Sequence, residues 1–463
     1  VEKLKVIAST HPWKEEIPAL VDALDEILGI STAEDFEFDE GKLTNSLSTL
    51  FSTLNDDSDV APGVTTRLGV CYRSEIIRNT MTVRLDELLD GAVGQNLLNS
   101  AKELGYYKKA ELSSLCSALN LFEIELEDFD ADKLTESVKE KIFTLNDPAE
   151  EGGERTKLDV VYPSVIFTGL FSEELYRALL DNTDEDRNQA PMIEEETLWL
   201  IKGGSRYSKE ELKNLINSIN VFGITSFEEI DTLDFDTVKQ KTEEEIDEIC
   251  LSLVIRGVMT YQIAQSDGID VNHPLAYEEG INILHTSEIS SLITLINSLP
   301  EQTDLEEMYF EEISLSSVKE NTFRQDGSVK SYLLLKSVST SVKNSSHLSV
   351  NDRLIDSYGC INHTELYKLI DAIITVQGTD NVNLYDFTEL NYPDLNKEQR
   401  AEVFGSEILR AKLTEQLISE NKPKEGQPQA KNYISGKNFT KYTDWRTRNS
   451  AYVISETELN ALF

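Results

Sequence analysis

The sequence has little positive charge and no long apolar segment. It contains 43 Lys and Arg residues against 84 Asp and Glu residues, which gives a formal net charge of −41 at pH 7. Because nucleic-acid binding depends largely on neutralising phosphate charge, we expect no nucleic-acid partner. No stretch approaches the roughly 18 consecutive apolar residues of a transmembrane helix, so we also expect no membrane insertion.

Histidine and cysteine, which build many catalytic and metal centres, are also scarce. The five histidines form no HxxxH or HExxH motif, and the chain has no P-loop, GxGxxG motif or nucleophile elbow. We therefore expect no catalytic residues, no cofactor and no enzymatic activity. The four cysteines lack paired spacing, which predicts packed core thiols rather than a zinc site or a disulfide framework. These cysteines are Cys71, Cys116, Cys250 and Cys360.

Two acidic stretches offer clustered oxygen ligands. They are residues 55–59 and 181–186, and both combine Asp with Asn. Neither has the Gly at position six and the Glu at position twelve that an EF-hand loop requires. We expect ordinary acidic loops here, and a structural calcium ion is the alternative.

A first pattern recurs along the whole chain. An acidic residue is followed directly by an aliphatic one, and further apolar residues stand three, four and often seven positions after that aliphatic residue. This spacing predicts an amphipathic helix with Glu near its positive N-terminal end. The six copies begin at Glu16, Glu111, Glu211, Glu288, Glu365 and Glu458.

A second pattern alternates with the first. It consists of a Ser, apolar residues at +2, +3, +7 and +11, and a hydroxyl residue at +8. It predicts a second amphipathic helix in which the Ser is an N-cap or a small packing residue, not a nucleophile. The +8 hydroxyl is expected to allow close helix packing and to bond back to a carbonyl one turn earlier. The five copies begin at Ser74, Ser164, Ser252, Ser331 and Ser406.

An acidic linker with an aromatic residue separates the two patterns. Its clearest forms are residues 35–39, 128–130 and 234–236, and it recurs in altered form at 309–312 and 385–387. We expect the aromatic side chain to fill the space between the two helices. Stretches rich in Gly, Pro and Asn then separate one unit from the next.

These patterns predict a mainly α fold, arranged as a tandem array of about five degenerate helical repeat units of roughly 75 to 100 residues. A sixth Glu-Leu helix begins just before Phe463, so we expect either adjacent repeats in a larger parent chain or packing of this half-unit on another chain. We place the units at 1–106, 107–206, 207–284, 285–361 and 362–452, with the start of a sixth at 453–463.

Residues 421–450 depart from the acidic background. They contain seven basic and two acidic side chains, with aromatic residues interleaved. On a strongly anionic protein, such a patch is expected to contact the acidic surface of a neighbouring unit or of a second copy. The alternative is a solvated loop between units. The partner-binding residues that we predict are Lys431, Tyr433, Lys437, Phe439, Lys441, Tyr442 and Trp445.

The Glu-Leu-x-x-Leu-Ile helix, the acidic-aromatic linker and the Ser-x-Ile-Ile-Arg helix together cover most of the chain. In this pattern the chain resembles the tandem helical repeat regions of very large surface or secreted proteins of low-GC Gram-positive bacteria and mollicutes. The resemblance implies a non-enzymatic, extracellular or cell-surface array that acts as a stalk, adhesin or filament segment.

Two other functions remain open. The first is an intracellular, cytoplasmic scaffold that binds protein partners between its units, and four free thiols are compatible with a reducing compartment. The second is an acid-base hydrolase with a carboxylate cleft between units, which requires converging carboxylates of shifted pKa.

Overall fold

The computed structural model of the chain describes most of its residues. They are 14–29, 40–61, 63–90, 93–124, 136, 139–180, 192–204, 206–239, 241–266, 269–299, 310, 312–378, 382–385, 387 and 395–420. The described part is mainly helical, which confirms the predicted fold class. Its only named strands are β1 (Lys102–Glu103) and β2 (Tyr106–Tyr107), which form a short antiparallel hairpin.

The chain divides into two compact units. The first comprises Val1–Leu233 together with Leu251–Ile255, and the second comprises Asp234–Cys250 and Arg256–Phe463. The division falls inside the third predicted repeat, 207–284.

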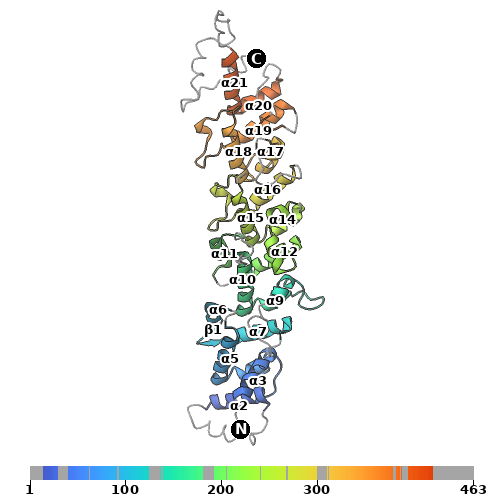
Figure 1. Cartoon of the computed structure of the whole chain (residues 1–463), viewed down its shortest axis with the longest axis vertical. Helices are drawn as coiled ribbons and strands as arrows, with labels where there is room; N and C mark the ends of the chain where they lie inside the picture. The colour runs from blue at the N-terminus through green and yellow to red at the C-terminus, as the bar shows by residue number, and fades with distance from the viewer. Residues whose placement is uncertain are drawn as a thin grey trace, which may run out of the picture. The chain divides into compact units, whose positions relative to one another are not determined.

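The first unit holds the helices coloured blue to green in Figure 1. They are α2 (Glu16–Leu28), α3 (Glu40–Thr53), α4 (Arg67–Cys71), α5 (Glu75–Leu88), α6 (Gln95–Ser100), α7 (Lys109–Phe122), η2 (Ile142–Thr144), α9 (Lys157–Val161), α10 (Val165–Leu180), α11 (Glu195–Lys202), α12 (Lys209–Phe222) and η3 (Phe227–Thr232). Within this unit α7 packs against α3 and α9, and α10 packs against α6 and α7.

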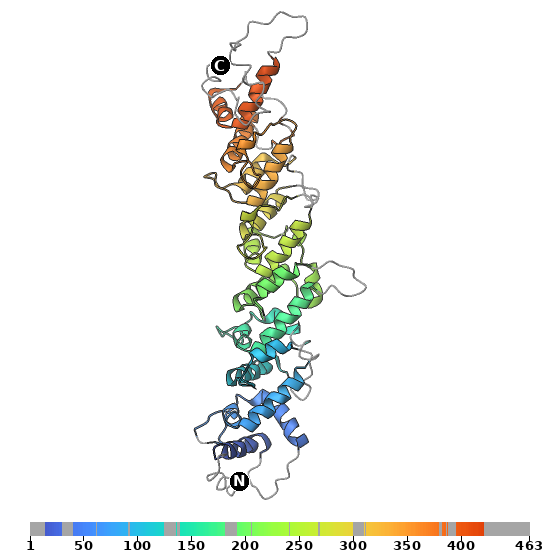
Figure 2. The ribbon, with the colours of Figure 1, turned by 90° about the vertical axis from the view of Figure 1, so that its left-hand side faces the viewer.

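The helices of the second unit can be followed by colour in Figure 2, where the ribbon is turned by 90°. They are α13 (Phe235–Val238), α14 (Glu243–Ile249), α15 (Leu253–Gln265, from Arg256 onward), η4 (Pro274–Ala276), α16 (Thr286–Asn297), α17 (Leu315–Thr322), α18 (Tyr332–Asn344), η6 (Asp352–Leu354), α19 (His363–Gln377), α20 (Lys397–Gly405) and α21 (Glu407–Glu420). In this unit α17 packs against α16, α18 and α19, and α19 packs against α20.

Both recurring sequence patterns form helices where they were predicted. The first five Glu-Leu copies lie in α2, α7, α12, α16 and α19, and the five Ser copies precede or begin α5, α10, α15, α18 and α21. The aliphatic residues of each stripe face the core, as in α12, where Leu212, Leu215, Ile216 and Ile219 are buried. The sixth Glu-Leu copy lies outside the described residues.

Short helices between the two patterns were not predicted. In three of them, α9, α14 and α20, the N-cap side chain bonds to the backbone of the third helical residue while that residue's side chain returns the bond. The caps are Thr156, Thr242 and Asn396. This capping box is readable in sequence as a hydroxyl or amide residue followed three positions later by an acidic residue or Gln, so the signal was present.

The cysteines and part of the acidic-aromatic linker fit the predictions. All four cysteines are buried and free of disulfides. Burial raises the pKa of the Cys71 and Cys250 thiols to about 12, so these thiols are protonated at neutral pH. Phe235 and Phe387 are buried as expected, but Tyr385 is 54% exposed. The linker copies at 35–39 and 128–130 lie outside the described residues.

None of the described helices has the length and apolar character needed to cross a bilayer.

Candidate functional site

A contact between the two recurring helices is repeated at five places in the described chain. The Glu that opens the first pattern accepts hydrogen bonds from the Ser and the first backbone N–H groups of a second-pattern helix. We call each such set a glutamate clamp. The five pairs are Glu16–Ser74, Glu111–Ser164, Glu211–Ser252, Glu288–Ser331 and Glu365–Ser406.

The Glu211 clamp shows the geometry. Its Oε1 accepts from the Ser252 hydroxyl at 2.7 Å and from Val254 N–H at 2.9 Å, and its Oε2 accepts from Leu253 N–H at 3.0 Å. The Ser–carboxylate distance stays between 2.5 Å and 2.8 Å in all five clamps. A carboxylate with two acceptor oxygens therefore satisfies N–H groups that a helix leaves unpaired at its start.

The predicted N-cap role of the serines is confirmed. Each Ser hydroxyl accepts a hydrogen bond from the backbone N–H three residues later while it donates to the glutamate. The five serines are fully buried. Each glutamate also lies near the start of its own helix, as predicted, but its carboxylate binds the N-terminus of a different helix.

The hydroxyl at +8 makes a second recurring contact, which we call a hydroxyl link. In four copies it accepts from a backbone N–H that lies four residues before the next clamp glutamate. The links join Thr82 to Tyr107, Ser172 to Tyr207, Thr260 to Leu284 and Ser339 to Ile361. Three of the five hydroxyls, Ser172, Thr260 and Thr414, also donate to the carbonyl one turn earlier, which confirms the expected back-bond.

A third contact escaped the sequence analysis. The tetrapeptide Thr-Leu-Asn-Asp occurs at 53–56 and again at 144–147. Asn55 donates to the Ser113 carbonyl at 2.8 Å, and Asn146 donates to the Lys213 carbonyl at 2.9 Å. Both acceptors stand two residues after a clamp glutamate. The two identical tetrapeptides are visible in the sequence and could have revealed this contact.

Arginine recurs near the clamps in different ways. Arg78, four residues after Ser74, lies over the rings of Tyr72 and Tyr106. The equivalent position in the next copy is Thr168, and there Arg206 reaches in from outside the helix. Its guanidinium donates to the Thr168 hydroxyl at 2.9 Å and lies over the Tyr162 ring. Cationic and aromatic groups therefore meet at both places although the sequence position of the cation differs.

The electrostatics of two clamps reflect their burial. Burial raises the pKa of Glu288 and of Glu365 above the ordinary value, and the hydrogen bonds from serine and backbone N–H groups partly offset that rise. The carboxyl oxygens of both residues are engaged by these donors. The two shifted carboxyls thus serve helix capping, a role that needs no substrate.

A hollow of about 690 Å³ lies in the second unit. Its lining includes Lys319, Glu320, Arg324, Lys330, Tyr367 and Asp371. The Lys319 ammonium binds the Asp371 carboxylate at 2.5 Å and lies over the Tyr367 ring. Cations therefore stand among the carboxylates here, whereas the hydrolase alternative requires carboxylates that converge on a substrate.

The candidate metal ligands lie apart from the two acidic stretches for which calcium was the alternative. In the stretch 55–59 the Asn55 amide is a donor to α7, as described above, and the stretch 181–186 lies outside the described residues. Among the described His, Cys, Asp and Glu residues, one group of three has ligand atoms within 4.8 Å of one another, namely His273, Asp356 and Cys360. Burial raises the pKa of Cys360 to about 11 and lowers that of His273.

The predicted partner-binding residues lie outside the described part of the chain. They are Lys431, Tyr433, Lys437, Phe439, Lys441, Tyr442 and Trp445.

Comparison with known proteins gives no relative for this chain. No family model matches it, and neither a curated protein nor a solved structure does so.

Proposed function

We propose that the chain is a non-enzymatic tandem array of about five helical repeat units that serves as a structural spacer or filament segment. The stalk, adhesin or filament of an extracellular or cell-surface bacterial protein is the setting that the sequence pattern favours. The scaffold alternative shares the array and differs in compartment and partners.

The recurrence of the glutamate clamp is the observation that carries this proposal. Five copies use the same residue types for the same contact, and four hydroxyl links fix the backbone just ahead of the next clamp glutamate. A catalytic centre is built once and is asymmetric, whereas repeated equivalent contacts are typical of units that stack on their neighbours. The shared chemistry of the copies therefore favours a mechanical role.

Small-angle X-ray scattering of the full chain tests the array. One compact globule of this length has a radius of gyration of about 23 Å. We expect a value well above this for a monomer whose mass is verified by sedimentation equilibrium. A monomer near 23 Å would contradict a spacer and would favour repeats folded back on one another.

Self-association through the basic residues of 421–450 is a second, separate part of the proposal. Neutralising Lys431, Lys437 and Lys441 to Gln should weaken an association that also weakens with added salt. The matched control replaces three exposed lysines elsewhere, Lys14, Lys109 and Lys397, by Gln. Equal sedimentation of the two triple variants and the parent chain would rule out this contact.

A further inference from the structure

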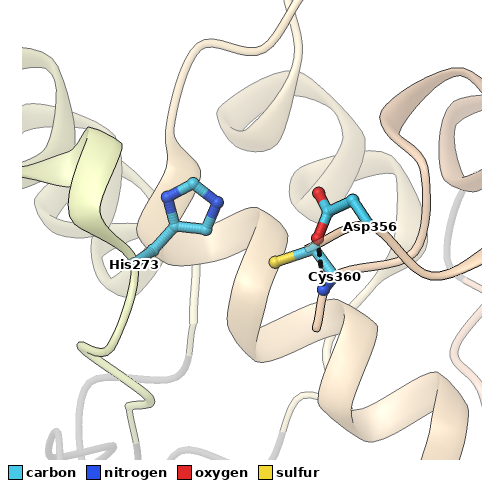
Figure 3. Close-up of side chains that lie close together, drawn as sticks. All are labelled: His273, Asp356 and Cys360. Carbon is cyan, nitrogen blue, oxygen red and sulfur yellow. Dashed lines mark hydrogen bonds between the residues drawn. The ribbon is translucent and has the colours of Figure 1, made fainter. Parts of the chain in front are cut away.

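We propose that His273, Asp356 and Cys360 form a binding site for one Zn²⁺ ion. The three residues offer an imidazole nitrogen, a carboxylate oxygen and a thiol sulfur, all within 4.8 Å of one another. Figure 3 shows the three side chains directed into the same space. This site is independent of the proposed structural function.

The packing around His273 fixes the direction of its ring. Its Nδ1 accepts a hydrogen bond from Leu275 N–H at 3.3 Å. Its ring centroid lies 4.9 Å from the ring centroid of Tyr332 and 5.0 Å from that of Tyr358. The other ring nitrogen, Nε2, is directed toward Cys360 and Asp356 (Figure 3). Binding at Nε2 requires the ring proton to move to Nδ1, so the bond from Leu275 N–H is lost and two donors then face each other at that place.

A tight turn presents the other two ligands. Asp356 N–H donates to the Cys360 carbonyl at 2.8 Å, and Asp356 Oδ1 accepts from Cys360 N–H at 3.0 Å (Figure 3). The second carboxylate oxygen has no hydrogen-bond role in this turn. Asp356 is exposed while Cys360 and His273 are buried, so the carboxylate stands where an ion would enter.

Charged residues surround the turn on both sides. The Lys336 ammonium donates to the Tyr358 carbonyl and the Lys343 ammonium to the Gly359 carbonyl, each at 2.7 Å. Asp270 contributes a negative charge near His273 and Cys360. The lysine ammonium groups bond to these carbonyls and not to the three candidate ligands, and both lie near enough to Cys360 to favour its thiolate form by lowering its pKa.

The donor set selects the metal class. A thiolate and an imidazole suit Zn²⁺ and disfavour Mg²⁺ and Ca²⁺, which prefer oxygen ligands. Tetrahedral bond lengths place such ligand atoms about 3.6 Å apart, so the widest pair must close by roughly 1 Å. The exposed Asp356 side chain is free to move toward the ion, and the His273 and Cys360 side chains make the rest of the adjustment. On binding, the thiol proton leaves to solvent and a water molecule takes the fourth position.

The other cysteines provide an internal comparison. Cys71, Cys116 and Cys250 are buried like Cys360, but none belongs to a group of candidate ligands among the described residues. The Cys71 and Cys250 thiols are buried in the core, and the Cys116 thiol donates to the Ser52 carbonyl. Any thiolate–metal bond in this protein should therefore depend on Cys360.

The experiment titrates the full reduced chain with Zn²⁺ by calorimetry and with Co²⁺ by absorption spectroscopy. Excess Mg²⁺ is present to occupy sites made of carboxylates alone. We expect one equivalent of Zn²⁺ to bind and the Co²⁺ form to show a thiolate-to-metal charge-transfer band. Cys360→Ser should abolish the band, and His273→Ala should weaken Zn²⁺ binding by at least about 100-fold, because loss of a direct ligand exceeds the roughly 10- to 100-fold effect of losing an outer-shell partner.

Cys250→Ser is the matched control, because it removes a buried thiol of the same unit that has no candidate ligand partners. Helical content by circular dichroism verifies that each variant is folded. A Co²⁺ complex of the parent chain without a charge-transfer band would overturn the proposal without recourse to any variant. An equal loss of the band in Cys250→Ser and Cys360→Ser would also overturn it.

Discussion

The Glu211 and Glu16 clamps make the same hydrogen bonds in different surroundings. Both carboxylates accept from a serine hydroxyl and from two backbone N–H groups at a helix start. Glu211 is only 5% exposed, whereas Glu16 is half-buried. The helix end determines the geometry of the clamp, and the exclusion of water determines how much its bonds stabilise.

The largest expected effect comes from removing the negative charge of the buried Glu211 clamp. In Glu211→Gln an amide NH₂ replaces one acceptor oxygen and faces a backbone or hydroxyl donor. We expect a loss of about 2 to 3 kcal/mol in unfolding free energy, measured by denaturant titration of the full chain. Hydrogen exchange at Leu253 and Val254 would localise the loss.

Glu210→Gln is the control for this change. Glu210 is the neighbouring residue on α12, and its side chain is exposed. We expect it to alter stability by no more than about 0.5 kcal/mol. Comparable losses in the two variants would show that the clamp contributes nothing beyond general charge.

A smaller effect is expected from a hydroxyl link. Thr260→Val keeps the side-chain shape but removes the acceptor of Leu284 N–H, which lies at 3.0 Å. Because this N–H is then left unpaired in a buried place, we expect a loss of about 1 to 2 kcal/mol. Thr260→Ser retains the hydroxyl and should recover most of the loss. If Ser and Val are equally destabilising, packing rather than the hydrogen bond is responsible.

Of the two clamp carboxylates, the half-buried one should respond less. In Glu16→Gln water can replace the lost acceptor, so we expect a loss of about 1 kcal/mol or less. The same denaturant titration compares this value with that of Glu211→Gln. A loss at Glu16 as large as that at Glu211 would contradict the role that we give to burial.

The contribution of Glu288 to the free energy of unfolding should change gradually with pH, unlike that of a carboxyl with an ordinary pKa. Its pKa is raised chiefly by burial, so the folded state holds the proton more tightly than the unfolded state does. Its contribution to stability is therefore fully present below the unfolded pKa and is lost as pH rises through the folded pKa.

The measurement subtracts the unfolding free energy of Glu288→Gln from that of the parent chain at each pH, which removes the effect of the other acidic groups. We expect this difference to fall as pH increases from about 4.5. A difference that rises over this range would mean that the hydrogen bonds from Ser331, Tyr332 and Leu333 outweigh burial.

The helices and their caps could be read from the sequence because both depend on local spacing. Apolar residues at helical intervals predicted α7 and α12, and the isolated serines predicted the N-caps of α5 and α18. The short helices α9 and α14 could have been predicted from their capping boxes. Their apolar stripes are too short for periodicity to reveal.

The pairing of the two patterns could not be read from spacing. Glu16 and Ser74 are 58 residues apart, whereas Glu211 and Ser252 are 41 apart. The segments between them differ in length and composition, and no local rule connects them. The arginine near the second clamp is a similar case. The residue four positions after Ser164 is Thr168, and Arg206 from a later segment reaches this place instead. Such a replacement depends on two distant segments that meet in space.

The sequence by itself determined the helical class, the recurrence of two amphipathic helices and the chemical type of each cap, since these follow from neighbours a few residues apart. Only the tertiary structure decided which glutamate caps the N-terminus of which helix, and that His273 lies close to Cys360. Contacts between distant segments depend on how buried faces pack, and that information is distributed over many residues rather than held in any one motif.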